Sequence, residues 1–237
     1  MSFDSSVRCV DVNSVNIGIM RDKVNVVNFG ATLAPMTRST YHHGDLRRAL
    51  LTEASELARS GGPDAVTLRE VARRLEVSPA AIYRHVPDRD ALLAEVAAMA
   101  RRDLARRMLG EVERVDESDL PRRSMQRFLA IGRAYIAFAH EEPNLLATAF
   151  LPIAPTGAET ADDPSPWHVL AAALDELVAT GAMPGERRAG AETIAWSAVH
   201  GFATLRAGRA FDVSGAPDPD PEAILDAIAR SLDMHVA

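Results

Sequence analysis

The chain has 237 residues, of which 47% are hydrophobic and 25% are charged. This balance excludes wholesale disorder, and no run approaches the roughly 18 uncharged apolar residues that a transmembrane helix needs. The one cysteine, Cys9, excludes an intramolecular disulfide framework, and neither CxxC nor HExxH zinc spacing occurs. The first residues do not have the pattern of a secretory signal. We therefore expect a globular cytoplasmic protein with no cofactor, no metal and no contact with a membrane.

The net charge of −7 is unevenly distributed along the chain. Residues 36–110 contain 13 arginines and 10 acidic residues, whereas residues 111–237 contain 10 arginines and 20 acidic residues. A basic segment followed by an acidic one suggests two domains with different partners, and a polyanion is a candidate for the first. A solvated surface with uneven charge is the alternative interpretation of this pattern.

Residues 1–35 differ from the rest because they alternate Val, Asn and Ile without a helical period. We interpret them as a flexible or non-native N-terminal extension and take Met36 as the natural start. At most they would form a short pair of strands, which is marginal in water.

After Met36, apolar residues recur at spacings of three and four, which predicts an all-α fold. Capping residues, glycines and prolines set the expected boundaries. The expected helices cover residues 44–60, 67–75, 78–85, 88–109, 121–141, 143–151, 167–180, 185–208 and 221–234.

Residues 67–86 form the most informative stretch. Thr67 and Glu70 have the spacing of a capping box, and Ser78 followed by Pro79 is typical of a second helix start. Two short helices joined by a tight turn indicate a helix-turn-helix. The second helix begins with small residues, which would let it approach base edges, and Arg84 could then reach a guanine. An ordinary helical hairpin is the alternative.

Residues 36–110 resemble the DNA-binding domain of TetR-type (TetR/AcrR) transcriptional regulators. The resemblance is carried by Thr67, Val71-Ala72, Val77-Ser78, Tyr83, His85, Asp88-Arg89 and Leu92-Leu93. The chain departs from the family pattern where Glu76 replaces the usual Gly, Val86 the usual Phe and Arg89 the usual Lys.

The resemblance implies two sets of DNA-binding residues. Phosphates would be contacted by Thr67, Ser78, Tyr83, His85 and the helix start at Arg89. Bases would be approached by Arg69, Ala80, Ala81 and Arg84, with Pro79 beside them at the start of the helix. Residues 37–44 resemble an arm that some family members lay along DNA, with a disordered lead-in as the alternative.

Residues 111–237 contain no catalytic motif and many aromatic residues, a subset of which could line an apolar cavity. A Trp-His-Gly pattern at Trp196, His200 and Gly201 resembles the effector domain named after it (WHG type), which implies that residues 111–237 are a helical ligand-binding and dimerisation domain. We expect a pocket for an apolar or aromatic effector lined by Phe128, Tyr135, Phe138, Phe150, Trp167, Trp196 and His200. The alternative is that most of these aromatic residues only fill the core.

Two apolar stripes on the last helices predict a homodimer in which paired helices form a four-helix bundle. The stripes consist of Ala191, Ile194, Ala195, Ala198 and Phe202, and of Ile224, Leu225, Ile228 and Leu232. The alternative is that both stripes complete the core of a single chain.

These features lead to one expectation and two rivals. The chain is expected to be a ligand-responsive regulator, usually a repressor, that binds a palindromic operator as a homodimer and is not an enzyme. The first rival is a DNA-binding regulator controlled by a protein partner, which predicts a filled core without a pocket of about 300 Å³. The second rival is an enzyme with its site in the C-terminal cavity.

Overall fold

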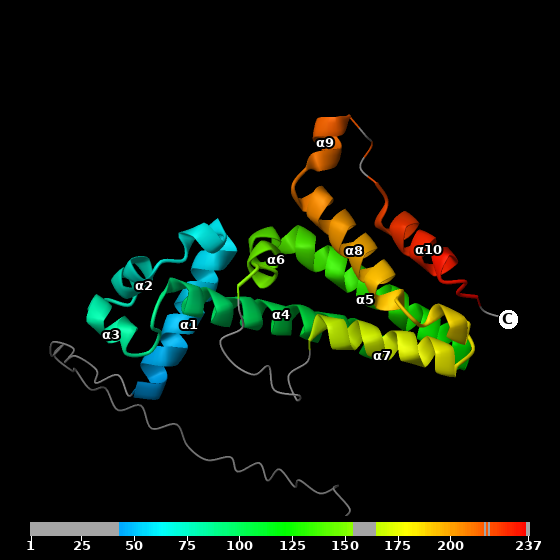
Figure 1. The fold of residues 1–237 in the computed structure, drawn as a ribbon, viewed down its shortest axis with the longest axis horizontal. Helices are drawn as coiled ribbons and strands as arrows, with labels where there is room; N and C mark the ends of the chain where they lie inside the picture. Colours follow the sequence, from blue (N-terminus) through cyan, green and yellow to red (C-terminus); the bar gives the residue numbers. More distant parts are fainter. Residues whose placement is uncertain (1–42, 154–164, 216, 218, 236–237) are drawn as a thin grey trace, which may run out of the picture. The chain divides into compact units, whose positions relative to one another are not determined.

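The computed structural model describes residues 43–153, 165–215, 217 and 219–235, all of which belong to the unit Tyr41–Ala237. The described residues form ten α-helices and two short 3-10 helices and contain no strand, which confirms the all-α prediction (Figure 1). The expected extension over residues 1–35 and residues 37–42 of the expected arm lie outside this description. Among the residues described, no helix is long and apolar enough to cross a membrane.

All the elements in the described ranges are helices. They are α1 (His43–Gly61), η1 (Pro63–Ala65), α2 (Leu68–Arg74), α3 (Pro79–Tyr83), α4 (Arg89–Glu113), α5 (Leu120–Glu141), α6 (Pro143–Ala149), α7 (Pro166–Ala179), η2 (Gly185–Arg187), α8 (Ala191–Ala207), α9 (Ala210–Ser214) and α10 (Pro221–Ser231).

Side-chain caps and prolines fix where most helices begin. The side chains of Thr67, Ser78, Asp88, Asp119, Ser165 and Asp220 each accept a hydrogen bond from a backbone N–H in the first turn of the following helix. Helices α3, α5, α6, α7 and α10 also have proline at their first or second position. Proline is well tolerated there, because the first N–H groups of a helix have no partner within the helix.

Helix α4 belongs to both halves of the fold. It packs against α1 on one side and against α5, α6 and α7 on the other, while α2 and α3 pack on each other beside α1 (Figure 1). The boundary expected between residues 110 and 111 falls within the last turn of α4. A displacement of α4 would therefore affect both halves at once.

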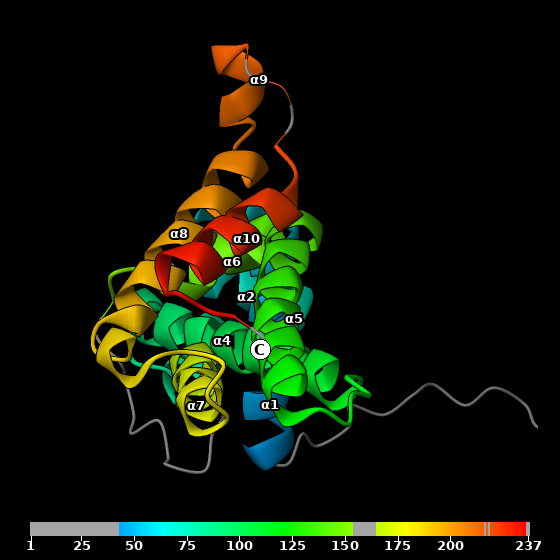
Figure 2. The same cartoon turned by 90° about the vertical axis from the view of Figure 1, so that its right-hand side faces the viewer.

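Helices α5, α8 and α10 lie side by side, with α7 against α5 and α8 (Figure 2). One continuous cluster of buried side chains runs from Leu50 in α1 to Leu232 after α10. Helices α5 and α10 approach closely at Gly132, where an added Cβ would lie 2.4 Å from Cδ2 of Leu225. The missing side chain lets α10 pack directly on α5.

One boundary prediction was wrong, and one short helix was missed. The expected continuous helix over residues 185–208 is divided into η2 and α8, because Gly190 adopts a left-handed conformation with φ of 79°. Helix α9 was not predicted, because its five residues are too few to establish a helical period.

Candidate nucleic-acid interface and aromatic cluster

The turn between α2 and α3 is closed by the backbone and capped at both helix starts. Thr67 Oγ1 accepts from the N–H of Glu70 at 3.2 Å, and Ser78 Oγ accepts from the N–H of Ala81 at 3.3 Å. The N–H of Val77 donates to the carbonyl of Ala72 at 3.0 Å, which holds the turn onto α2. The geometry is that of a helix-turn-helix.

Glu76 occupies the left-handed region of the backbone map in this turn, with φ of 53°. Left-handed conformations are costly for residues that have a Cβ, so glycine is usual at such positions. Glu76 therefore adopts in this turn the conformation that glycine adopts at least cost.

The side chains predicted to contact DNA are mostly exposed. Thr67, Arg69, Ser78, Pro79, Ala80, Tyr83 and Arg84 are exposed, whereas Ala81 and His85 are half-buried. Tyr83 is not a core residue, because 56% of its surface is exposed. Ile82 and Val86 are buried instead and hold α3 to the core. The outer side of α3 thus presents small residues first, then a hydroxyl and a guanidinium.

Arg89 differs from the other predicted contacts because its side chain binds the protein's own backbone. Its Nε donates to the carbonyl of Val66 at 2.8 Å, and its Nη2 donates to the carbonyl of Pro63 at 2.7 Å. The guanidinium therefore ties the start of α4 to η1, a tertiary contact that no spacing in the sequence indicates.

Glu70 and the two arginines that follow it form a small ionic network on α2. Arg73 Nη2 lies 2.6 Å and Arg74 Nε 3.1 Å from Glu70 Oε1, and Arg74 Nη1 also lies 2.8 Å from Oε1 of Glu53 in α1. Hydrogen bonds from Arg73 and Arg74 lower the pKa of Glu70 to about 2. The predicted capping box is therefore half formed, because the carboxylate faces the arginines.

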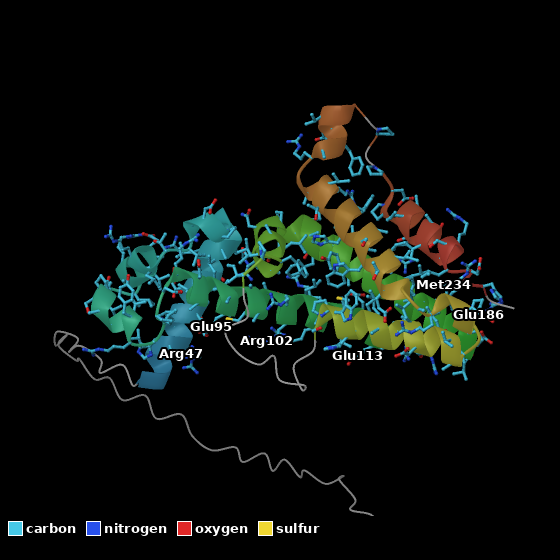
Figure 3. The ribbon with its side chains drawn as sticks, viewed as in Figure 1. Arg47, Glu95, Arg102, Glu113, Glu186 and Met234 are labelled. Carbon is cyan, nitrogen blue, oxygen red and sulfur yellow. The ribbon has the colours of Figure 1, made fainter. Side chains whose placement is uncertain are left out.

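A second ion pair joins α1 to α4. Arg47 Nη2 lies 2.8 Å from Glu95 Oε2, and both side chains are labelled in Figure 3. Exposed pairs of this kind contribute little to stability. This pair nevertheless neutralises one cation of the basic segment, so fewer arginines are available for phosphates than the composition suggests.

The second candidate site is an aromatic cluster where α5, α6 and α8 meet. The rings of Tyr135, Phe150, Trp196 and His200 lie in mutual contact, with centroid distances from 5.2 to 6.4 Å. Trp167 joins the cluster through Trp196, at 5.8 Å. Five of the seven residues predicted for a pocket are thus brought together.

The other two predicted pocket residues lie in the core. Phe128 lines a small interior cavity together with Tyr135 and Trp196. Phe138 is fully buried, with the guanidinium of Arg107 4.9 Å from its ring centroid, and lines neither that cavity nor the groove described next.

Two spaces adjoin the aromatic cluster. The interior cavity has a volume of about 30 Å³, enough for a water molecule. A surface groove of about 370 Å³ lies between α6 and α8, and Phe150 and His200 contribute to its wall. Only the groove has the size of a small-molecule site. Sequence reasoning missed its other wall residues, because Leu146 and Thr204 have no distinguishing pattern.

Tyr135 and His200 form the polar centre of the cluster. Tyr135 Oη lies 2.7 Å from His200 Nδ1. Burial raises the pKa of Tyr135 well above its ordinary value and lowers the pKa of His200. At neutral pH the tyrosine therefore keeps its proton and the histidine is uncharged.

The stripes predicted to form a dimer interface lie mostly inside the chain's own core. Of the nine residues, Ala191, Ala195, Phe202, Leu225, Ile228 and Leu232 are buried within the single chain. That part of the prediction was wrong, because a helix packed within one chain shows the same apolar period as a helix at an interface. Ala198 and Ile224 are half-buried, and Ile194 is 46% exposed.

Comparison with known proteins identifies the family of this chain. Residues 50–96 match the family model described as bacterial regulatory proteins of the tetR family, and residues 128–232 match a tetracyclin repressor-like C-terminal domain. The chain is 24% identical over 169 residues to the uncharacterized HTH-type transcriptional regulator YobS of Bacillus subtilis, covering 71% of this chain and 83% of that protein.

Solved structures agree in fold. A protein of unknown function from Rhodococcus sp. RHA1 is 33% identical with a TM-score of 0.62, covering 82% of this chain and 99% of that one. The TetR regulator SCO7222 of Streptomyces coelicolor is 18% identical with a TM-score of 0.52, covering 79% and 95%. Fold and turn together define a helix-turn-helix transcriptional regulator. The chain belongs to the TetR family and is a DNA-binding protein.

Proposed function

We propose that the protein is a homodimeric repressor that binds a palindromic operator and releases it when a small effector binds the C-terminal domain. The observation that carries the proposal is the exposed start of α3. Ser78 caps it, and Pro79 and Ala80 leave its outer side free of bulky groups that would prevent a close approach to base edges. The narrower assignment of the C-terminal domain to the Trp-His-Gly type remains a prediction.

Dimerisation is proposed through the outward side of α8. Ile194 and Leu205 are 46% and 49% exposed, and Ala198 and Gly201 lie between them at helical spacing. Small residues between two exposed apolar ones allow two helices to approach closely. A two-fold axis at this side would place two α3 helices for matching half-sites.

Helix α6 is proposed to transmit the effector's signal. Arg59 of α1 contacts Glu142 at 3.1 Å, and Asn144 Nδ2 donates to the carbonyl of Arg59 at 3.1 Å. Arg101 of α4 donates to the carbonyl of Ala149 at the other end of α6, at 2.7 Å. The aromatic cluster begins at the next residue, so a shift of Phe150 would displace contacts to both α1 and α4.

The test begins with selection of bound duplexes from a random pool, followed by measurement of affinity for the selected operator. Arg84→Ala should weaken specific binding by about 1–3 kcal/mol, because a base contact is lost. Arg122→Ala, which removes an exposed arginine at the start of α5, should leave binding unchanged. Equal affinities of the two variants, or a protein that remains monomeric at working concentrations, would contradict the proposal.

The small interior cavity favours a second candidate, a DNA-binding regulator controlled by a protein partner. The cavity lined by Phe128, Tyr135 and Trp196, within the described part of the C-terminal domain, has a volume of about 30 Å³, which is too small for a drug-sized ligand. Operator release by a metabolite panel, measured on the purified protein alone, would favour the first candidate. Release that requires an added protein would favour the second.

A further inference from the structure

We propose that the groove between α6 and α8 is the effector site and that it selects an uncharged, largely apolar molecule carrying a hydrogen-bond acceptor, which His200 Nε2–H binds. This inference rests on the proposed function only in calling the molecule an effector, since binding to the groove can be measured without DNA. Two observations support the inference, the size of the groove and the chemistry of its wall, together with an assignment of the His200 proton that follows from its contact with Tyr135.

Size distinguishes the groove from the interior cavity at the aromatic cluster. The groove has a volume of about 370 Å³, whereas the interior cavity has about 30 Å³. Ligand sites usually fall between about 300 and 1,000 Å³. A small molecule therefore fits the groove without any rearrangement of the core.

The wall of the groove contains no formal charge. Pro143, Leu146 and Phe150 of the α6 segment supply apolar surface. Polar atoms come from Asn144 of the same segment and from His200 and Thr204 of α8. None of the residues that line the groove is Asp, Glu, Lys or Arg. An ionised ligand would lose hydration here without gaining an opposite charge, which is costly.

The proton on His200 can be assigned from its partner. The hydroxyl of Tyr135 is buried and needs an acceptor, and among the described residues its hydrogen-bond partner is His200 Nδ1, at 2.7 Å. Nδ1 therefore accepts, and the proton of the neutral imidazole must be on Nε2. Since His200 also lines the groove, Nε2–H is a donor for a ligand there.

The position of this donor links ligand binding to the rest of the fold. The ring of Phe150, which ends α6, lies 5.2 Å from that of His200. A ligand held by Nε2–H would lie against Phe150 and α6. Binding would thus bias the element that contacts both α1 and α4.

Intrinsic fluorescence provides the readout on the full-length protein. Both tryptophans of the chain, Trp167 and Trp196, belong to the aromatic cluster, and Trp196 stacks on His200 with ring centroids 6.4 Å apart. Three probes of matched shape are compared, namely 4-tert-butylcyclohexanone, 4-tert-butylcyclohexylammonium and 4-tert-butylcyclohexanecarboxylate. The ketone should bind at least about tenfold more tightly than either ion, because only the ketone is an uncharged acceptor.

Variants test the assigned roles, and calorimetry supplies an independent readout. His200→Phe removes the donor and should weaken ketone binding by about three- to tenfold, the loss expected for one hydrogen bond. Thr204→Phe, one turn beyond His200 on the same face of α8, fills the groove while keeping the imidazole, and should abolish binding. The control is His140→Phe, which replaces an exposed histidine of α5 and should change nothing.

Each result decides between the inference and its alternatives. Equal binding of the three probes, ketone binding unaffected by both His200→Phe and Thr204→Phe, or no binding of the ketone at millimolar concentration would overturn the groove assignment. If the ketone binds as expected but operator affinity stays unchanged, the groove is a selective site and the effector role fails. If the protein without ligand does not bind the operator, the proposed function is contradicted, and the groove assignment is unaffected.

Discussion

At the scale of single residues, Glu76 shows how a local cost is tolerated in the turn between α2 and α3. Its φ of 53° lies in the left-handed region, which costs a residue with a Cβ about 1–2 kcal/mol. Glu76→Gly should therefore stabilise the protein by about 1 kcal/mol relative to Glu76→Ala, which keeps the Cβ. Chemical denaturation of the two variants measures this difference. A glycine variant no more stable than the alanine variant would contradict the explanation.

A substitution at Arg89 distinguishes a structural role of its side chain from a role in DNA binding. Because its guanidinium binds the carbonyls of Val66 and Pro63, Arg89→Met should lower the free energy of unfolding by about 1–3 kcal/mol. The salt dependence of operator binding should keep its slope, since no phosphate contact is lost. Thermal unfolding and binding at several salt concentrations provide the two measurements. A slope reduced by about one unit would show that Arg89 contacts a phosphate after all.

Capping residues are the part of the site that sequence predicts well. Thr67 and Ser78 cap the helices expected of them, because a cap depends on neighbours within three positions. The partners of Arg89 and of the Glu70 carboxylate depend on geometry formed only after folding. Spacing therefore identified the turn but not the ionic contacts around it.

At the scale of elements, the packing of α10 on α5 depends on Gly132. Gly132→Ala should destabilise the protein by about 1–3 kcal/mol, since its new Cβ would lie 2.4 Å from Leu225 Cδ2. The matched control is Gly110→Ala in α4, where an added Cβ meets nothing within 4 Å and should stabilise the helix by about 0.5–1 kcal/mol. Urea denaturation compares the two. Similar effects of both substitutions would mean that α10 moves away freely.

Helix positions were predictable because capping residues and apolar spacing are local signals. Whether each apolar stripe packs within the chain or against another chain could not be predicted from such signals. The stripe containing Ala195 and Phe202 packs inside the chain, whereas Ile194 on the same helix faces outward. A period of 3.6 residues identifies a buried face without indicating whether the partner belongs to the same chain.

At the scale of the whole molecule, the half-buried His200 links stability to pH. Burial lowers the pKa of His200 in the folded protein. Below about pH 6.5, His200 therefore binds a proton more readily in the unfolded chain than in the folded protein. The unfolded state then binds more protons, so stability should fall as pH decreases from about 6.5 toward the lowered pKa. Denaturation between about pH 5.5 and about pH 7.5, about one unit on either side of the ordinary pKa, should show a shallower fall for His200→Phe than for His140→Phe. Identical pH profiles of the two variants would contradict this assignment.

The charge distribution also acts at this scale. The basic segment and the acidic C-terminal segment together give a net charge of −7, yet the exposed Arg69 and Arg84 belong to the basic part. A polyanion approaching the other end of the chain would be repelled. Charge asymmetry was readable from sequence alone, although the share of arginines already neutralised by Glu53, Glu70 and Glu95 required the structure.

The prolines at the helix starts restrict how this protein can change shape. A helix that begins with proline cannot grow backward by another turn, because the ring lacks an N–H and crowds the preceding residue. Helices α3, α5, α6, α7 and α10 therefore have fixed first residues. Regulation by winding additional turns at these ends is closed to the molecule, which leaves tilting and sliding of whole helices as its means of response.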